Sequence, residues 1–305
     1  MDSITTKEHF MKNASEWVEY GHIKEGYNYP VGKHRNRIVK KIIKKNQSIN
    51  SILDIGCGGG NLCIDLAKEG YKVKGIDESG EMIKIANKSI KKLGIGNNVS
   101  FAEKSLYDVK GDGKKYDAIT SMGVIDYLDS DNILFDIANR KLYKGGKFIV
   151  SCRNRLFNLF PTSHYFKDET GSLHSMRMLL DEINELKGDI SNESMSRFSE
   201  SLRLINLDKY LVKREARREA KSTINKDPGF TYRQHTPNEI LQSAQESGFE
   251  RTDIFGVHPH LLPPVMNDML PCGLYNEISS ILEPLESLPI SLIWSSVFIS
   301  VFEKK

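Results

Sequence analysis

The sequence predicts an α/β fold in which a mainly parallel sheet carries helices on both faces. From residue 51 to residue 152, short apolar runs alternate with amphipathic stretches of helical period, and a cluster of glycines follows the first apolar run directly. Such alternation is typical of parallel sheets, because each crossover between parallel strands requires a helix. The chain of 305 residues is long enough for one large domain with insertions.

Five apolar runs in the first half of the chain are the predicted strands. They are SILDI (51–55), YKVKGID (71–77), a run near NVSFAE (98–103), YDAITSM (116–122) and KFIVSC (147–152). A first helix is expected from about Asn61 to Gly70, and a second from an N-cap at Ser79 to Gly94. The apolar face of the second helix is Ile83, Ala86, Ile90 and Leu93, and a third helix contains Ile133, Leu134, Ile137 and Ala138. Gly145 and Gly146 are expected to turn the chain into the fifth strand.

The flanking segments follow other patterns. Residues 1–49 are expected to be helical with a break at 27–32, and the spacing of Ile38, Ile42 and Ile43 predicts that these side chains face a core. From 155 to 230 the pattern is helical, with one apolar face made by Leu173, Met176, Leu179, Leu180, Ile183 and Leu186.

The C-terminal part of the chain returns to the strand pattern. The sequence TPNE (236–239) predicts a capping box with Pro at the first helical position, and strands are expected at 249–257 and 294–305. We therefore expect three parts: N-terminal helices with the sheet core (1–154), a helical lid (155–230), and the remainder of the core (231–305). The last part contains a mostly irregular insertion at 258–293, which holds six of the ten prolines.

Composition narrows the class of protein. The net charge is 43 − 40 = +3, which is too small to favour a nucleic-acid-binding protein. The four cysteines have no C-x-x-C spacing, so we expect reduced thiols and no metal site. The N-terminus lacks the apolar core of a secretory signal, and the most apolar segment, 288–302, is too short to span a membrane. We expect a cytoplasmic protein.

The glycine loop has a spacing that excludes two common ligands. Gly56, Gly58 and Gly60 form G-x-G-x-G, whereas the dinucleotide fingerprint needs a glycine at 61 or 63, where this chain has Asn61 and Cys63. A phosphate-cradling loop needs Lys-Ser or Lys-Thr after the glycines, and neither dipeptide is there.

Two acidic residues point to another ligand. Asp54 ends the first predicted strand beside the loop, and Asp77 ends the second strand, 21 residues after Gly56. A carboxylate in the position of Asp77 can accept hydrogen bonds from both ribose hydroxyls. Asp54 would repel a pyrophosphate but suits an ammonium group. S-adenosylmethionine (SAM) has an ammonium, a sulfonium and a ribose, and no phosphate.

The sequence resembles the class I SAM-dependent methyltransferases, in particular the small-molecule branch that includes quinone-biosynthesis O-methyltransferases. The resemblance covers 35–155, 231–256 and 294–305, and neither insertion. It rests on D-I-G-C-G-G-G (54–60), G-I-D-E-S-G-E-M-I (75–83) and Y-D-A-I-T-S-M-G-V-I-D-Y-L (116–128). It implies SAM as the cofactor and a Rossmann-like, doubly wound sheet of seven strands. The implied strand order is 3-2-1-4-5-7-6, with strand 7 antiparallel.

The resemblance also implies which residues bind SAM. The methionine moiety would lie against the loop, the ribose at the end of the second strand, the adenine near Met82 and the end of the third strand, and Met122 with Gly123 would close the pocket. The implied residues are Asp54, Gly56, Cys57, Gly58, Asp77, Glu78, Met82, Ser105, Leu106 and Met122, with Tyr20, Tyr27 and Arg35 reaching in from the N-terminal segment. Ser105 departs from the family pattern, which often has an acid there to contact the adenine amino group.

The methyl acceptor is expected beyond the carboxyl ends of the strands. Methyl transfer from a sulfonium is an in-line displacement that needs orientation, and it needs a base only where the acceptor loses a proton. We expect His164 and His235 as candidate bases. The side chains expected to line the site are Arg153, Asn154, Tyr232 and His258.

These features favour a small-molecule methyltransferase, monomeric or homodimeric, that acts on a hydroxyl oxygen of a sugar, a quinone-like compound or another secondary metabolite. The Asn/Asp-Pro-Pro-Tyr motif of amino-group methyltransferases is absent after the fourth strand, where the residues are SMGV. Two alternatives stay open: a tRNA-modifying methyltransferase, against which the low net charge counts, and a SAM-binding protein without catalytic activity.

Overall fold

The computed structural model describes residues 14, 29–109, 113–159, 169, 173–185, 232–261 and 274–305. Its centre is a seven-stranded sheet in the order β3-β2-β1-β4-β5-β7-β6, with β7 antiparallel to both of its neighbours. This confirms the fold class, the strand order and the direction of strand 7. The strands are β1 (Ser51–Ile55), β2 (Lys72–Asp77), β3 (Val99–Glu103), β4 (Tyr116–Met122), β5 (Leu142–Arg153), β6 (Phe249–Pro259) and β7 (Ser295–Lys304).

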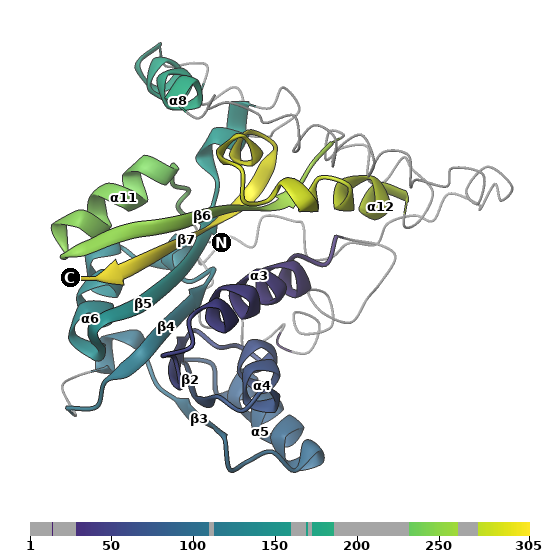
Figure 1. The fold of residues 1–305 in the computed structure, drawn as a ribbon, viewed down its shortest axis with the longest axis vertical. Coiled ribbons are helices and arrows are strands. Elements are labelled where there is room, and N and C mark those ends of the chain that lie inside the picture. The colour runs from purple at the N-terminus through teal and green to yellow at the C-terminus, as the bar shows by residue number, and fades with distance from the viewer. Residues whose placement is uncertain are drawn as a thin grey trace, which may run out of the picture.

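Helices cover both faces of this sheet, as Figure 1 shows: α3, α4 and α5 lie on one face, and α6 and α11 on the other. Two further helices, α8 and α12, lie near the ends of β5 and β6. The helices are α3 (Val31–Lys45), α4 (Asn61–Lys68), α5 (Gly80–Leu93), α6 (Asp131–Lys141), α8 (Leu173–Glu185), α11 (Pro237–Glu246) and α12 (Leu274–Ser280).

Two apolar cores hold the layers together, one on each face of the sheet. On the α6 side, four phenylalanines meet at ring-centroid distances of 5.4–6.5 Å: Phe135, Phe148, Phe249 and Phe302. On the α3 side the core contains Ile38, Ile42 and Ile43, which confirms the face predicted from their spacing. Burial of these side chains supplies the main favourable term in folding.

Local signals fix the ends of the two best-predicted helices. The Ser79 hydroxyl accepts a hydrogen bond from the Met82 amide at the start of α5, which ends at Gly94 with φ of 67°. Thr236 and Glu239 form a reciprocal capping box at the start of α11. Both helices were predicted from these signals, because each side-chain cap satisfies amides that a helix leaves unpaired.

Two predictions of burial were wrong, and one strand begins earlier than predicted. Leu93 and Leu180 are exposed (45% and 46%) because the last turn of α5 and the outer side of α8 face away from the sheet. Gly145 and Gly146 lie within β5, which begins at Leu142, five residues before the predicted strand. Gly145 has φ of 76°, and the pairing with β4 moves from Leu142 to Lys147, so the chain is irregular at these glycines.

The two insertions are described only in part. After β5 there is a 3₁₀ turn (Arg155–Leu159) followed by α8, and the helices predicted from 186 to 230 lie outside the described residues. The region 258–293 was predicted to be mostly irregular, and it contains α12 and two 3₁₀ turns, Glu283–Leu285 and Pro289–Ile293. None of the helices in the described ranges has the length and apolar character needed to cross a membrane.

Candidate active site

The glycine loop (56–60) lies where β1 ends, beside the end of β2, and its backbone is already hydrogen-bonded. The amides of Gly56 and Cys57 both donate to the Ile76 carbonyl, at 2.8 and 3.0 Å. The Gly58 amide donates to Asp77 Oδ2 at 2.8 Å. Three successive amides of the loop therefore point at the end of β2, so they are not available to bind a phosphate. This agrees with a ligand that has no phosphate.

The loop requires glycine at two positions for different reasons. Gly56 has φ of 71°, and a Cβ there would lie 2.2 Å from Val124 Cγ2. Gly58 has φ of 50°, and a Cβ there would meet only Met82 Sδ, at 4.0 Å. Positive φ is costly for other residues. Gly56 is therefore required for packing, whereas the space beside Gly58 is open for a ligand that lies against the loop.

Asp77 lies at the end of β2, in the position expected to bind a ribose. Its two carboxylate oxygens accept hydrogen bonds from the amides of Gly58 (2.8 Å) and Ser79 (2.9 Å). Each oxygen retains a lone pair that can accept from a hydroxyl. The two amides fix the orientation of the carboxylate before any ligand binds.

Asp54 is buried beneath the loop (2% exposed). Oδ1 accepts from Thr120 Oγ1 at 2.7 Å, and Oδ2 accepts from Cys63 Sγ at 3.2 Å. Burial raises the pKa of Asp54 to about 6, although these two hydrogen bonds lower it. A desolvated carboxylate of this kind gains from a cationic neighbour, such as the ammonium group of an amino acid.

The other residues expected to bind the cofactor lie at or just beyond the carboxyl ends of β2, β3 and β4. Met82 is buried on α5 against Gly58, and Glu78 follows Asp77 directly. Ser105 and Leu106 begin the 3₁₀ turn after β3, and Met122 ends β4. The end of β3 also brings Glu103 beside Asp77 in the sheet register.

Arg35 reaches this edge of the sheet from α3. Its Nη1 donates to Ser151 Oγ at 3.4 Å and lies 2.9 Å from the position that a Cβ would take at Gly123. Its Nε is buried, and among the described residues it has no hydrogen-bond partner. Because buried donors are rarely left unpaired, this atom points to a missing anionic or polar ligand.

Arg153 lies at the end of β5, next to these groups. Its guanidinium stacks on the Tyr232 ring at 4.0 Å, and Tyr127 is hydrogen-bonded to it. The Arg153 amide donates to the Asp126 carboxylate, at 3.1 and 3.3 Å from its two oxygens. The structure thus brings two predicted acceptor-site residues, Arg153 and Tyr232, into direct contact.

His235 is buried between two carboxylates. It is 4% exposed, with Nε2 3.1 Å from Asp131 Oδ1 and Nδ1 3.8 Å from Asp126 Oδ1. Burial lowers the pKa of His235, but the hydrogen bond with Asp131 and the negative charges of Asp131 and Asp126 outweigh it and raise the pKa to about 9. A protonated imidazole cannot accept a proton, so this environment disfavours a role as base at neutral pH.

His258 has the opposite environment. Its ring stacks on Tyr29 at 4.7 Å and packs against His260 at 4.2 Å, and Nδ1 lies 2.9 Å from Ser296 Oγ. Burial and the neighbours His260, His34 and Arg35 lower the pKa of His258 well below its ordinary value. Its φ of 54° is unusual for a residue other than glycine.

Asn154 is buried at the end of β5, and its side-chain amide is fully engaged. Nδ2 donates to the carbonyls of Leu292 (2.6 Å) and Ser295 (2.7 Å), and Oδ1 accepts from the Leu156 amide at 3.1 Å. Such bonding favours a structural role, in which Asn154 anchors the segment before β7.

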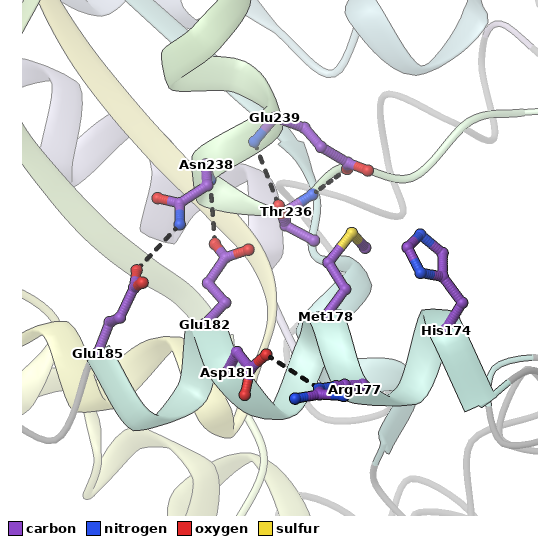
Figure 2. Close-up of a pocket in the computed structure, with 9 residues that line it drawn as sticks. All are labelled: His174, Arg177, Met178, Asp181, Glu182, Glu185, Thr236, Asn238 and Glu239. Atoms are coloured by element: carbon purple, nitrogen blue, oxygen red, sulfur yellow. Dashed lines mark hydrogen bonds and ion pairs between the residues drawn. The ribbon is translucent and has the colours of Figure 1, made fainter.

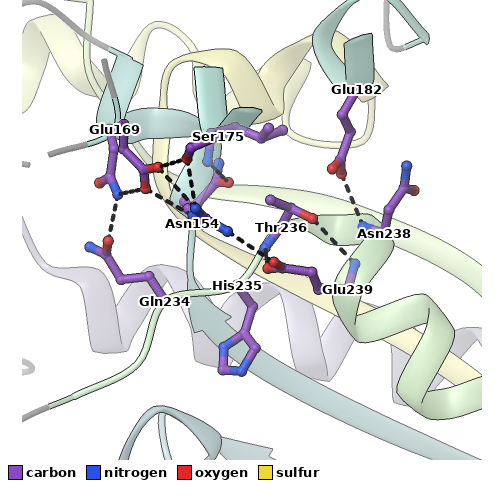
Figure 3. Close-up of polar contacts among 12 residues, drawn as sticks. Asn154, Glu169, Ser175, Glu182, Gln234, His235, Thr236, Asn238 and Glu239 are labelled. Atoms are coloured by element: carbon purple, nitrogen blue, oxygen red, sulfur yellow. Dashed lines mark hydrogen bonds and ion pairs between the residues drawn. The ribbon is translucent and has the colours of Figure 1, made fainter. Parts of the chain in front are cut away.

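A network of polar side chains ties α8 to the end of β5, as Figure 3 shows in part. Arg155 binds both carboxylate oxygens of Glu169, at 2.8 and 3.0 Å, and also Glu239 Oε1 at 3.0 Å. Ser175 and Asn158 donate to the same Glu169. We call this group of residues the Arg155 clasp.

An open pocket of about 370 Å³ lies between α8 and α11, away from the glycine loop. Figure 2 shows that acidic side chains from α8 point at the start of α11, and Glu182 Oε1 accepts from the Asn238 amide at 3.0 Å. Acidic groups stabilise the positive end of a helix. The acidic side chains that line the pocket therefore connect α8 to the N-terminal end of α11.

Sequence analysis missed the roles of Asp126, Asp131 and Arg233. Asp126 and Asp131 flank His235, and Arg233 binds Asp131 and donates to the Ile125 carbonyl at 3.1 Å. These contacts join residues that are more than a hundred positions apart in the sequence, so no local sequence pattern could predict them. The only signal was the recurrence of aspartates after β4.

Three predicted residues, His164, Tyr20 and Tyr27, lie outside the described residues. Within the described ranges, no group of three or more His, Cys, Asp or Glu side chains is arranged to hold a metal ion.

Comparison with known proteins decides the family. A family model described as "Methyltransferase domain" matches residues 46–206, slightly more than half of the chain. The chain belongs to this methyltransferase family. It is a SAM-dependent methyltransferase of class I.

Individual relatives agree with this assignment. The ubiquinone biosynthesis O-methyltransferase of Pelagibacter ubique is 30% identical over 168 residues, which are 51% of this chain and 68% of the relative. The protein of the same name from Coxiella burnetii is 24% identical over 155 residues, which cover 65% of its length. The fold is similar to that of magnesium protoporphyrin IX methyltransferase from Synechocystis PCC 6803 with bound SAH, with a TM-score of 0.54 at 14% identity. That match covers 98% of this chain and 97% of the other.

The residues at the sheet edge fit SAM. In bound SAM, Asp77 would accept hydrogen bonds from the ribose, Asp54 would face the ammonium group, and the Nε of Arg35, which has no partner among the described residues, would face the methionine carboxylate. The open space at Gly58 leaves room for the part of SAM that connects its ribose to its ammonium and carboxylate groups. When bound, SAM supplies an activated methyl group, and the protein has only to hold the acceptor in line with it.

Proposed function

We propose that this methyltransferase transfers the methyl group to an oxygen atom of a small molecule. The observation that carries the proposal is the contact of Arg153 with Tyr232 and Tyr127 at the carboxyl end of β5. These side chains lie next to Arg35 and the end of β4, so an acceptor bound by them would lie beside the cofactor. Polar donors on an aromatic support suit an oxygen-bearing organic molecule.

The relatives support the same proposal. The two curated relatives described above carry names that specify O-methylation in ubiquinone biosynthesis. The net charge of +3 counts against an RNA substrate, because nucleic-acid binding requires a basic surface that neutralises several phosphates.

A hydroxyl acceptor and a carboxylate acceptor place different demands on the site. A hydroxyl must lose its proton, so it requires a base, whereas a carboxylate is already ionised at neutral pH. His164 and His235 were the proposed bases. The paired state of His235 disfavours that role, and His164 lies outside the described residues.

The test uses SAM with a deuterated methyl group. Purified protein is incubated with this SAM and, separately, with small-molecule and RNA fractions of a cell extract, and mass spectrometry identifies the fraction that gains the label. We expect the label in a small molecule, on oxygen. Label in RNA, on nitrogen or carbon, or in neither fraction would contradict the proposal.

A further inference from the structure

One arginine at the acceptor edge of the sheet, Arg153, has no ion pair with a carboxylate among the described residues, because the nearby carboxylates are bound to other groups. Asp131 is bound to Arg233 and His235, and Asp126 receives the Arg153 amide and lies beside His235. Within the described part of the chain, the Arg153 guanidinium makes no ion pair with a carboxylate.

Arg153 is also held in a fixed orientation. One face of the guanidinium lies on the Tyr232 ring at 4.0 Å, and the edge is hydrogen-bonded to Tyr127. Guanidinium has five N–H donors in a planar fork that matches the two oxygens of a carboxylate. The stacking contact and the one hydrogen bond leave other N–H groups of the Arg153 guanidinium able to bind a carboxylate.

The described histidines at this edge do not offer a base for a neutral hydroxyl. His235 is engaged with Asp131 and Asp126, which keep it protonated, because its pKa is raised to about 9. The rings of His258 and His260 pack against each other at 4.2 Å, and burial lowers the pKa of His260 to about 3. In neither environment does the histidine have a pKa near neutral pH, which is the range in which a general base works best.

We propose that the methyl acceptor is the carboxylate of a small organic acid, bound by Arg153, and that the product is a methyl ester. This inference rests on the proposed function and narrows its acceptor oxygen. A carboxylate oxygen forms the new bond to the methyl carbon while the carbon–sulfur bond of SAM breaks, with its electron pair left on sulfur. The carboxylate anion and the sulfonium cation become two neutral groups, so no proton is transferred and no base is needed.

The experiment begins with the labelled product from the deuterated-SAM reaction on the small-molecule fraction. The product is treated with mild alkali, which cleaves methyl esters and leaves methyl ethers intact. We expect deuterated methanol to be released. Label that stays on an ether would overturn the carboxylate inference while the proposed function stands, and absence of any labelled product would contradict the proposed function itself.

Variants then test the role of Arg153. We expect Arg153→Gln to lower ester formation at least tenfold at a limiting acid concentration and Arg153→Lys to restore part of it, because lysine keeps the charge and loses the fork. SAM affinity, measured by calorimetry, should stay within twofold in both variants. Arg140→Gln is the matched control, since Arg140 is exposed on α6. Unchanged ester formation by Arg153→Gln would overturn the assignment of Arg153.

Discussion

The charge of His235 is set by two aspartates that the fold brings to it. Asp131 and Asp126 reach the imidazole from the helix and the turn that follow β4, and Arg233 lies beside Asp131. His235 also joins the sheet edge through its backbone, because its amide donates to the Arg153 carbonyl at 3.1 Å and its carbonyl accepts from the Arg155 amide at 2.9 Å. The residue therefore fastens the chain returning from the insertion onto β5.

This pairing predicts a stability that depends on pH. The pKa of His235 rises from 6.5 to about 9 on folding, so its contribution is fully present below pH 6.5 and is lost as the pH rises through 9. A shift of this size corresponds to about 3 kcal/mol. We expect the difference in unfolding free energy between wild type and His235→Gln, from urea titration, to be about 3 kcal/mol larger at pH 6 than at pH 10. An equal difference at both values would show that His235 is neutral in the folded protein.

Among the residues of the site, the sequence predicted those that belong to one short motif. Asp54, Gly56, Gly58 and Asp77 occupy the ends of two adjacent strands, so the predicted strands together with the strand order implied by the resemblance brought them together. It could not predict that the loop amides bind Ile76 and Asp77. The contact of Arg153 with Tyr232 depends on where the chain returns to the sheet after the long segment that separates these two residues. The spacing of apolar residues carries no information about that position.

At the scale of secondary-structure elements, the Arg155 clasp connects α8 to the core. Glu169 is 7% exposed and accepts from Arg155, Ser175 and Asn158, so the clasp is a largely desolvated ionic network. Charge-assisted hydrogen bonds of this kind are stronger than neutral ones. We infer that the clasp determines how firmly α8 is held over the end of β5.

Removal of the clasp should loosen α8 without unfolding the sheet. For Arg155→Ala we expect amide hydrogen exchange in 173–185 to become at least tenfold faster, because charged hydrogen bonds contribute about 1.5–3 kcal/mol, while amides of β1 and β4 keep their rates. Arg177→Ala is the control, since Arg177 lies on α8, is exposed, and is 4.0 Å from Asp181 in its one ion pair with a described residue. Exchange that is equally fast in both variants, or unchanged in Arg155→Ala, would show that the clasp does not hold the helix.

Element prediction succeeded where local capping and periodicity agreed. Helices α5 and α11 begin at their predicted caps, and the structure contains all seven expected strands, in the order that the family resemblance implies. The prediction of burial failed at Leu93 and Leu180. Both residues fit the helical spacing of the apolar face, but no neighbouring element covers them at their positions in the helix. Tertiary packing, which decides how far each face is covered, is not contained in local spacing.

At the scale of the whole molecule, the sheet order explains why one edge contains the site. Strands β1 and β4 are neighbours at the centre of the sheet, where the crossovers change direction, and ligands of such sheets bind beyond the carboxyl ends of the strands at that point. The glycine loop, Asp77, Arg35 and Arg153 all lie along this edge. Cofactor and acceptor can therefore be bound side by side.

The central claim is that the glycine loop and Asp77 bind SAM, and calorimetric titration of SAM into the protein tests it most directly. We predict saturable binding by wild type, affinity lowered about a hundredfold in Asp77→Ala from the loss of two ribose hydrogen bonds to a charged acceptor, and wild-type affinity in Asp136→Ala, a control on the exposed side of α6. Thermal unfolding of each variant checks that it is folded at the temperature of the titration, so that the SAM affinities of folded proteins are compared. Absence of SAM binding by wild type, or equal affinity in Asp77→Ala and wild type, would contradict the account.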